Sequence, residues 1–354
     1  MERPRYAYML GIITFLLALT ASASGHAQSV MDKAKQEGEV IVWTQSFDNS
    51  DDFLKGFYAK YPFLKVKIWD GRSEEVINKV VTEAAAGKFS PDVLLLSTRA
   101  FPAIHKAGLL QEYKWPARIK DWPHQPAHGY WRIQAASIRI PAYNTNMVKA
   151  ADVPKSWDDI NSAKWRGKAV ISSSGADAAL LFADLWKKPN GDLNWEKATT
   201  FWKEVIDKTK PKVIRGFSGG FDAVASGESA IFLVSSTNSG LNFIKKGAPI
   251  NFASVGRTVA SPWGIGVPKT LPHPNASQLF LDYLLSEEGL LSYLEAVNGM
   301  TVDPVVGKKA FGNNAMQKAG VEWYPVDDET RSDEDIRKAT RWWTTALGVR
   351  KGKK

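Results

Sequence analysis

The sequence predicts an α/β fold of two lobes, each an open mixed sheet flanked by helices. Over residues 39–97, short runs of β-forming residues alternate with amphipathic helical segments. A second alternating set follows an extended stretch near residue 138, which indicates a second unit of the same kind. With 354 residues, 44% of them hydrophobic and 23% charged, the chain is long enough to bury two cores.

The first unit is expected to run strand, helix, strand, helix, strand. Asn49 to Asp52 can cap the first helix, whose apolar residues keep helical spacing until Pro62 ends it. Ser73 opens the second helix, with acidic residues in its favourable first turn. The apolar run PDVLLLS is typical of a parallel strand buried on both faces. The expected elements are strands at 40–44, 65–69 and 91–97 and helices at 53–61 and 73–87.

The second unit begins with a long strand over RIQAASIRI, after which Pro141 introduces the next segment. Three strand-and-turn elements follow, and the chain then returns to the first lobe through the strand GIGVPK and one amphipathic helix. The expected elements are strands in 132–140, 167–173, 212–215, 229–236 and 264–269 and a helix over 275–297. The expected first lobe covers residues 28–138 and about 253–310, and the second covers 139–252 and about 311–354.

The N-terminus has the pattern of a secretory signal peptide. Arg3 and Arg5 precede an apolar run over residues 9–21 and a series of small residues, so residues 1–27 are expected to be removed. The run is shorter than the roughly 20 residues of a membrane-spanning helix. Because the chain has no cysteine, it cannot carry a lipid anchor at a processing-site cysteine or a disulfide. We therefore expect a soluble periplasmic protein.

Polar residues follow the strands of the first unit, at the edge where open α/β sheets bind ligands. The candidate binding residues there are Thr44, Gln45, Ser46, Arg72, Ser97, Thr98 and Arg99. The formal net charge of +9 favours anionic partners, although a solvated basic surface explains it equally well. Lysines and arginines are scattered and no recognition motif is present, so nucleic acid is not expected as a partner.

The stretch GFSGG fits the G-x-S-x-G pattern of a serine hydrolase, with Ser218 as nucleophile. That chemistry needs a histidine later in the chain, and the sequence offers only His273, in a loop before a helix. The preferred interpretation is that Gly216, Gly219 and Gly220 let the backbone approach a ligand, with Ser218 donating a hydrogen bond. An ordinary glycine turn before a helix remains the alternative. No catalytic residue is predicted.

Neither a metal nor a cofactor is predicted. His124 and His128 have the H-x-x-x-H spacing, but Pro126 and the surrounding proline-rich loop argue against the helix that would align them. The glycine pair at Gly264 lacks the third glycine and the following helix of a dinucleotide-binding fingerprint.

The order of several motifs resembles the type 2 periplasmic solute-binding proteins of ABC transporters, in the branch that includes ferric-iron, phosphonate and polyamine binders. The motifs are AKQEGEVIVWTQS, FSPDVLLLSTRAFPAIHKAGLLQEYKWP, YNTNMV followed by VPKSWDDINSAKWRGKAVIS, AVASGESAI, and GIGVPKTLPHPNASQLFLDYLLSEEG. The resemblance implies the two-lobed periplasmic binding protein type 2 fold, with a cleft between lobes that close on the ligand. It also implies an inner-membrane permease as partner, and the chain is expected to act as a monomer.

The resemblance implies binding residues in the second lobe opposite those of the first. They are Tyr143, Ser173, Ser174, Gly175, Arg215, Ser218, Gly219, Gly220, Ser235 and Ser236, together with Trp263 on the returning strand. A serine-rich loop at a helix N-terminus offers hydrogen-bond donors to an anion, although simple helix capping accounts for residues 172–175 as well.

The ligand is expected to be a small anion, either a carboxylate, a phosphonate or a sugar phosphate. Ferric binders present adjacent tyrosines where this sequence has Ser235 and Ser236, and neutral hydroxyls cannot replace phenolates around a trivalent cation. Polyamine binders would line the cleft with carboxylates, whereas the strand ends here carry Asp70 against Arg72 and Arg99. An arginine fork suits carboxylate or phosphate, although each arginine could instead form a structural ion pair.

We therefore expect a periplasmic solute-binding component of an ABC importer that performs no chemistry on its ligand. Two alternatives remain open. One is a secreted serine hydrolase that uses Ser218. The other is a periplasmic sensor subunit that uses the same fold.

Overall fold

The structure is a computed structural model that describes residues 29–45, 51–71, 73–88, 90–120, 122–175, 177–326 and 333–349. The expected signal peptide and the candidates Ser46 and Arg72 lie outside these residues. Within the described part of the chain, no helix combines the length and the apolar character needed to cross a membrane.

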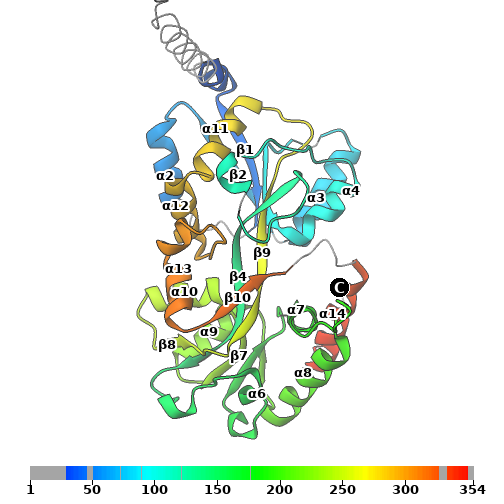
Figure 1. Cartoon of the computed structure of the whole chain (residues 1–354), viewed down its shortest axis with the longest axis vertical. Helices are drawn as coiled ribbons and strands as arrows, with labels where there is room; N and C mark the ends of the chain where they lie inside the picture. Colours follow the sequence, from blue (N-terminus) through cyan, green and yellow to red (C-terminus); the bar gives the residue numbers. More distant parts are fainter. Residues whose placement is uncertain are drawn as a thin grey trace, which may run out of the picture.

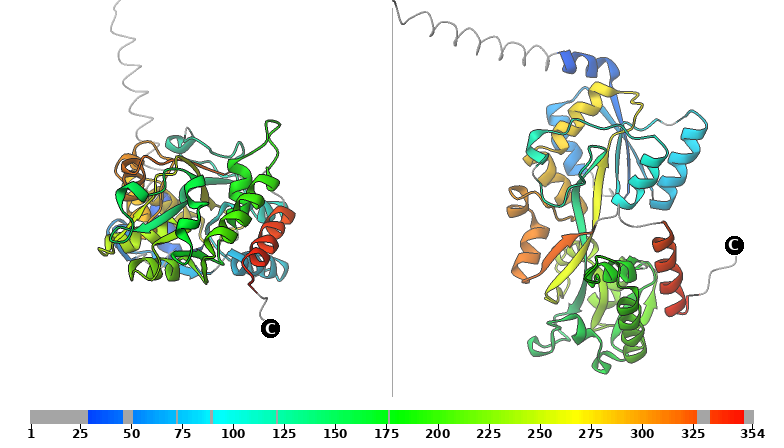
Figure 2. Two further views of the ribbon diagram at one scale, coloured as in Figure 1. Left: turned by 90° about the horizontal axis from the view of Figure 1, so that it is seen from below. Right: turned by 45° about the vertical axis from the view of Figure 1, so that its right-hand side comes forward.

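The strands form two lobes joined by long shared strands (Figures 1 and 2). Along the sheet the order is β2-β1-β3-β9-β4-β7-β5-β6, with β10 beside β9 and β8 beside β4. The pairing is parallel between β1 and its neighbours and between β10 and β9, and antiparallel between β9 and both β3 and β4, so the sheet is mixed. The strands are β1 (Glu39–Thr44), β2 (Lys65–Asp70), β3 (Val93–Ser97), β4 (Trp131–Asn144), β5 (Ala169–Ser172), β6 (Lys212–Ile214), β7 (Ile231–Ser236), β8 (Ile250–Phe252), β9 (Arg257–Gly266) and β10 (Glu322–Pro325).

Strand β4 passes from one lobe to the other. Its first part, as far as Ile138, pairs with β9, while its second part, from Arg139 onward, pairs with β7 and β8. The change of partner therefore falls between two adjacent residues. Figure 1 shows β4 and β9 running together between the lobes.

Helices cover both faces of each half of the sheet. They are α2 (Asp51–Lys60), α3 (Ser73–Ala85), α4 (Phe101–Lys106), α5 (Ala117–Lys120), α6 (Trp157–Ile160), α7 (Asp177–Leu185), α8 (Trp195–Thr209), α9 (Phe217–Ala225), α10 (Thr237–Lys245), α11 (Pro274–Leu284), α12 (Glu287–Val297), α13 (Phe311–Lys318) and α14 (Asp333–Ala346). In β1, Val40 and Val42 face the core under α2, α11 and α12, whereas Trp43 faces the core under α3 and α4.

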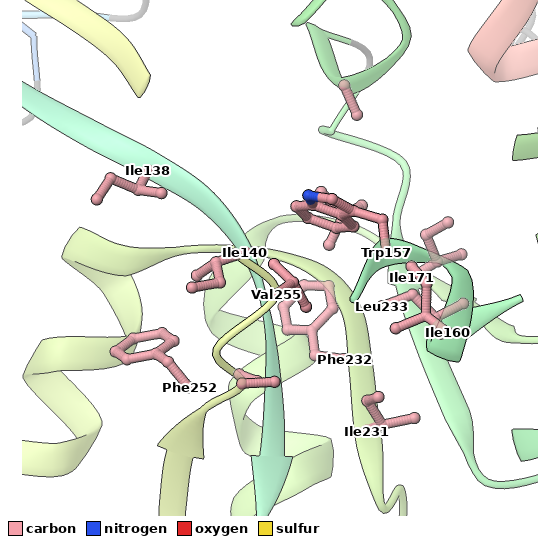
Figure 3. Close-up of a cluster of buried hydrophobic side chains, with 14 of the residues drawn as sticks. Ile138, Ile140, Trp157, Ile160, Ile171, Ile231, Phe232, Leu233, Phe252 and Val255 are labelled. Carbon is pink, nitrogen blue, oxygen red and sulfur yellow. The ribbon is translucent and has the colours of Figure 1, made fainter. Parts of the chain in front are cut away.

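The second lobe has its own core, part of which is shown in Figure 3. Side chains from β4, β5 and β7 meet there, among them Ile140, Ile171 and Phe232. Trp343 of the C-terminal helix α14 is fully buried in the same core and packs at 5.3 Å from Trp202 of α8. The C-terminal helix is thus part of the second lobe.

The predicted fold class is confirmed, with local differences that have physical causes. Strand β4 continues through Pro141, because its register shifts between Ile140 and Ala142 and so accommodates a residue without an N–H. The strand expected at 264–269 begins earlier and ends at Gly266. The single helix expected over 275–297 is two helices, because the Ser286 side chain accepts the Gly289 N–H and caps a new one.

Candidate functional site

The strand ends of the first lobe bring several predicted residues together. Gln45 follows β1, and its Oε1 accepts a hydrogen bond from the Ser97 N–H at the end of β3 (3.1 Å). Arg99 is partly buried, and its Nε donates to Ser97 Oγ (3.4 Å). These side chains, together with Thr44 at the end of β1, form one polar edge, which we call the first-lobe edge.

The crossing strands complete this edge. Trp263 of β9 lies opposite Ser97 in the sheet, and the Thr98 hydroxyl donates to the Pro262 carbonyl (3.2 Å). Trp263 also pairs with Ala135 of β4. Ala135 therefore marks the position of the first-lobe edge along β4. Arg139 lies four residues further along this strand, which corresponds to about 13 Å of extended chain.

Arg139 is a candidate that the sequence analysis missed. It lies on β4 where the strand enters the second lobe, and only 7% of it is exposed. Its guanidinium pairs with Asp177 at the start of α7, through Nη2 to Oδ2 at 2.7 Å and Nε to Oδ1 at 3.4 Å. Nη1 donates to Ser236 Oγ (3.0 Å), and the Phe217 ring lies 4.8 Å from the guanidinium carbon.

Predicted residue Ser236 belongs to the same group. Its hydroxyl lies 2.8 Å from that of Ser137 and donates to Asn238 Oδ1, which also accepts from Ser137 (2.9 Å). We call Ser137, Arg139, Asp177, Ser236 and Asn238 the Arg139 cluster. These bonds use three of the five N–H donors of the guanidinium, and the remaining two have no partner among the described residues.

The serine-rich loop after β5 stands beside this cluster, because it leads directly into α7 and Asp177. The Ser172 hydroxyl accepts the Ser174 N–H (3.1 Å), and Ser174 Oγ accepts the Gly216 N–H (3.2 Å). Ser173 is partly buried, and its N–H donates to the Ile214 carbonyl (2.8 Å).

The C-terminal helix α14 also contacts the serine-rich loop. Trp343 Nε1 donates to the Ser172 carbonyl (3.0 Å), and a Cβ on Gly175 would lie 3.6 Å from the Trp343 ring. These contacts give residues 172–175 a structural role in the second lobe.

The GFSGG segment forms the first turns of α9 rather than a loop. Gly216 adopts a positive φ of 77° before the helix, and Ser218 is exposed in its first turn. A Cβ on Gly220 would lie 2.2 Å from the Phe232 ring, so this glycine lets α9 approach β7. Gly220 therefore has a packing role between α9 and β7; Gly219 has more space, with Ile214 Cδ1 nearest at 3.7 Å.

Three further predicted residues form no hydrogen bond with the Arg139 cluster in the described part of the chain. Tyr143 pairs with Ile231 at the opposite end of β7 and packs against the second-lobe core. Ser235 is fully buried, and its hydroxyl donates to the Ile140 carbonyl (2.7 Å), which is a structural bond. Arg215 is exposed after β6.

The histidine required for hydrolase chemistry lies in the other lobe from Ser218. His273 Nδ1 is 2.8 Å from Oδ2 of the buried Asp92, and its backbone N–H donates to Oδ1 of the same carboxylate (2.8 Å). This pair fastens the start of α11 to the start of β3. In the described residues, no group of three or more histidines or carboxylates has the arrangement of a metal site.

Comparison with known proteins gives a consistent result. Residues 52–317 match the family described as "Bacterial extracellular solute-binding protein". The chain is 25% identical over 295 residues to the Fe(3+)-binding periplasmic protein of Serratia marcescens, covering 77% of this chain and 81% of that protein.

Solved structures share the fold. Iron-bound HitA from Pseudomonas aeruginosa superposes with a TM-score of 0.67 at 18% identity, over 87% of this chain and 99% of that one. AfuA from Actinobacillus pleuropneumoniae with bound fructose-6-phosphate gives 0.64 at 17% identity, over 88% and 99%. The family match and the shared two-lobed fold agree with the expected type 2 solute-binding protein of an ABC transporter. The chain belongs to the family of bacterial extracellular solute-binding proteins.

Proposed function

We propose that this protein captures a small anionic solute in the periplasm and delivers it to the permease of an ABC importer. The observation that carries the proposal is the buried Arg139, whose guanidinium has two N–H donors without a partner among the described residues, beside Ser137 and Ser236. A guanidinium edge pairs with two oxygens of a carboxylate, phosphonate or phosphate.

The Asp177 carboxylate supports this role. A charged guanidinium is costly to bury without a partner, and Asp177 lowers that cost while it holds the side chain in one orientation. Arg99 on the first-lobe edge has a single partner in the described residues, Ser97, and supplies a second positive charge across the crossing strands. An anion held between the two arginines would contact both lobes and favour their closure.

The lobe boundaries and location belong to the same proposal. The change of pairing partner between Ile138 and Arg139 supports a first lobe of residues 28–138 and about 253–310. A signal peptide at residues 1–27 and the periplasmic relative from Serratia marcescens support export to the periplasm.

Ferric iron is the second candidate ligand, and the relative named as an Fe(3+)-binding protein favours it. The positions of the tyrosines weigh against it. Ser235 and Ser236 occupy the end of β7, and Tyr143 lies at the strand's far end. Tyr324 bonds to Asp184 in the second lobe, and burial raises the pKa of Tyr293 to about 12, so this side chain stays protonated rather than forming a phenolate. Hard trivalent cations prefer anionic oxygen ligands, which the two serines do not supply.

Thermal unfolding of the mature chain against a ligand panel separates the two candidates. The panel contains citrate, gluconate, methylphosphonate, glucose 6-phosphate, spermidine, ferric chloride and ferric citrate. Binding at about 100 times Kd adds about 2.7 kcal/mol, and hence several degrees to Tm. We expect stabilisation by at least one anion without iron. Stabilisation by ferric chloride alone would establish the iron assignment and overturn the anionic one.

The same assay with variants locates the site. Arg139→Gln should weaken anion binding by about 30-fold or more, since a buried charge contact is worth about 2 kcal/mol or more. Arg139→Lys keeps the charge but loses the fork and should give an intermediate loss. The exposed Arg166→Gln serves as the matched control and should bind as the unchanged protein does. Equal binding by all three variants would place the anion elsewhere.

A further inference from the structure

In the described part of the chain, two buried polar atoms at or near the first-lobe edge have no hydrogen-bond partner. They are Thr44 Oγ1 and Gln134 Oε1, in residues that are 1% and 0% exposed. Buried polar groups in folded proteins are nearly always bonded, and an unbonded one costs about 1–3 kcal/mol. Two such atoms near the same edge of one sheet indicate a place where a bound ligand supplies the missing hydrogen bonds.

Sheet register places Gln134 at the level of the strand ends. Its neighbour Ala135 lies opposite Trp263, and Trp263 lies opposite Ser97, the last residue of β3. Gln134 itself falls at a register irregularity between Ile133 and Ala135, where a bulge redirects the side chain. It thus lies between the first-lobe edge and Arg139, five residues further along the same strand.

Tyr293 of α12 is hydrogen-bonded to Gln134. Gln134 Nε2 donates to the Tyr293 hydroxyl (3.4 Å), and the ring is almost completely buried. Burial raises the pKa of Tyr293 to about 12, and the nearby negative charge of Asp70 acts in the same direction. Asp70 is the sheet partner of Thr44, and alternation along β1 puts Thr44 on the same face as Val40 and Val42, which pack in one core with Tyr293. Thr44, Gln134 and Tyr293 are all uncharged at physiological pH, and we call them the neutral cluster.

We propose that the neutral cluster is the first-lobe half of the binding site, that it takes hydroxyl groups, and that the solute is therefore a hydroxylated anion. Sugar phosphates and sugar acids are members of this class. The inference rests on the proposed function, in which Arg139 binds the anionic group.

Hydroxyl groups fit this region because each both donates and accepts a hydrogen bond. The unbonded Gln134 oxygen needs a donor, whereas the Thr44 hydroxyl accepts either role. If the Gln134 amide is turned over, its free end becomes a donor, and a ligand hydroxyl still serves it. An alkyl chain in the same place would leave both polar groups without a partner, so the site rejects it.

Two matched pairs of probes test the inference by calorimetric titration of the mature protein. Gluconate is compared with hexanoate, and glycerol 3-phosphate with propyl phosphate, since each pair shares an anionic group and differs in hydroxyls. We expect the hydroxylated member of at least one pair to bind tenfold or more tightly. Tyr293→Phe, which removes one oxygen, should reduce that preference at least fivefold while affinity for the alkyl member changes less than twofold.

Controls separate the failure of this inference from that of the proposed function. Tyr324→Phe removes a hydroxyl that donates to Asp184 in the second lobe and should keep the full preference. Gln134→Met should fold, because it conserves volume, and should lose the preference as Tyr293→Phe does. If alkyl and hydroxylated anions bind equally, or if Tyr293→Phe keeps the preference, the inference is wrong while the anion site stands. If no probe of either pair binds, the inference is overturned, and the ligand panel then decides the anion site.

Discussion

The Arg139 cluster and the neutral cluster are both buried groups of polar side chains, but they differ in how far their hydrogen bonds are formed without a ligand. In the Arg139 cluster, the charged side chain is bonded to Asp177 and Ser236 without any ligand. In the neutral cluster, Thr44 and Gln134 keep unbonded atoms. The difference follows from cost, since an unpaired buried charge destabilises a fold by several kcal/mol and an unpaired hydroxyl or amide by about 1–3 kcal/mol. A charged half-site therefore needs its ion pair before the ligand binds, whereas a neutral half-site can leave hydrogen bonds that only the ligand forms.

The largest expected effect is the loss of one partner from the buried ion pair. Asp177→Asn leaves the Arg139 charge unpaired and should lower the free energy of unfolding by about 3–5 kcal/mol. Replacing both partners by apolar residues of similar size, as Arg139→Met with Asp177→Leu, should recover most of that loss. Urea unfolding of the single and double variants measures the coupling. Additive losses would show that the pair does not act as a unit and would weaken the contrast between the two clusters.

The next effect appears at high pH and belongs to the neutral cluster. Because the pKa of Tyr293 is raised from 10.0 to about 12, the unfolded chain releases this proton first. The free energy of unfolding should therefore be unaffected by Tyr293 below about pH 10 and fall by about 2–3 kcal/mol between pH 10 and 12.

Comparison of wild type with Tyr293→Phe isolates this effect. Tyr113, whose pKa burial also raises to about 12, is present in both proteins, so the difference between their pH curves belongs to Tyr293. Curves that stay parallel above pH 10 would mean that the Tyr293 hydroxyl is solvated in solution, and the neutral cluster would then not be buried as described.

The sequence revealed the strand ends but not the residues that lie between them. Thr44 and Ser97 were found because alternating strands and helices bring carboxyl ends to one edge. Arg139 was missed because its partner lies 38 residues away, and the contact between Gln134 and Tyr293 spans 159 residues. Local sequence patterns do not show which distant residues will be in contact. A signal was present nonetheless, since a charged and an amide side chain inside an otherwise apolar strand must have partners.

A smaller effect tests which glycines of α9 serve the fold. Gly220→Ala should lower the free energy of unfolding by about 1–3 kcal/mol, because its Cβ would overlap the Phe232 ring. Gly219→Ala is the matched control, and with ordinary spacing around it should stabilise the helix by up to about 1 kcal/mol. Differential scanning calorimetry measures both. A Gly220→Ala protein of normal stability that no longer binds anions would restore the hypothesis that this glycine approaches the ligand.

The smallest expected change in stability comes from removing one buried hydroxyl in each lobe, that of Ser235 or that of Thr44. Ser235→Ala removes a bond to the Ile140 carbonyl and should cost about 1 kcal/mol in the second lobe. Thr44→Val removes a hydroxyl that has no hydrogen-bond partner among the described residues. The free energy of unfolding of the ligand-free protein should therefore stay unchanged or rise by up to about 1 kcal/mol. With a hydroxylated anion bound, the order should reverse, because only Thr44→Val loses a ligand contact. If Thr44→Val destabilises the free protein as much as Ser235→Ala does, a tightly held water fills the neutral cluster, and a ligand must displace it to bind there.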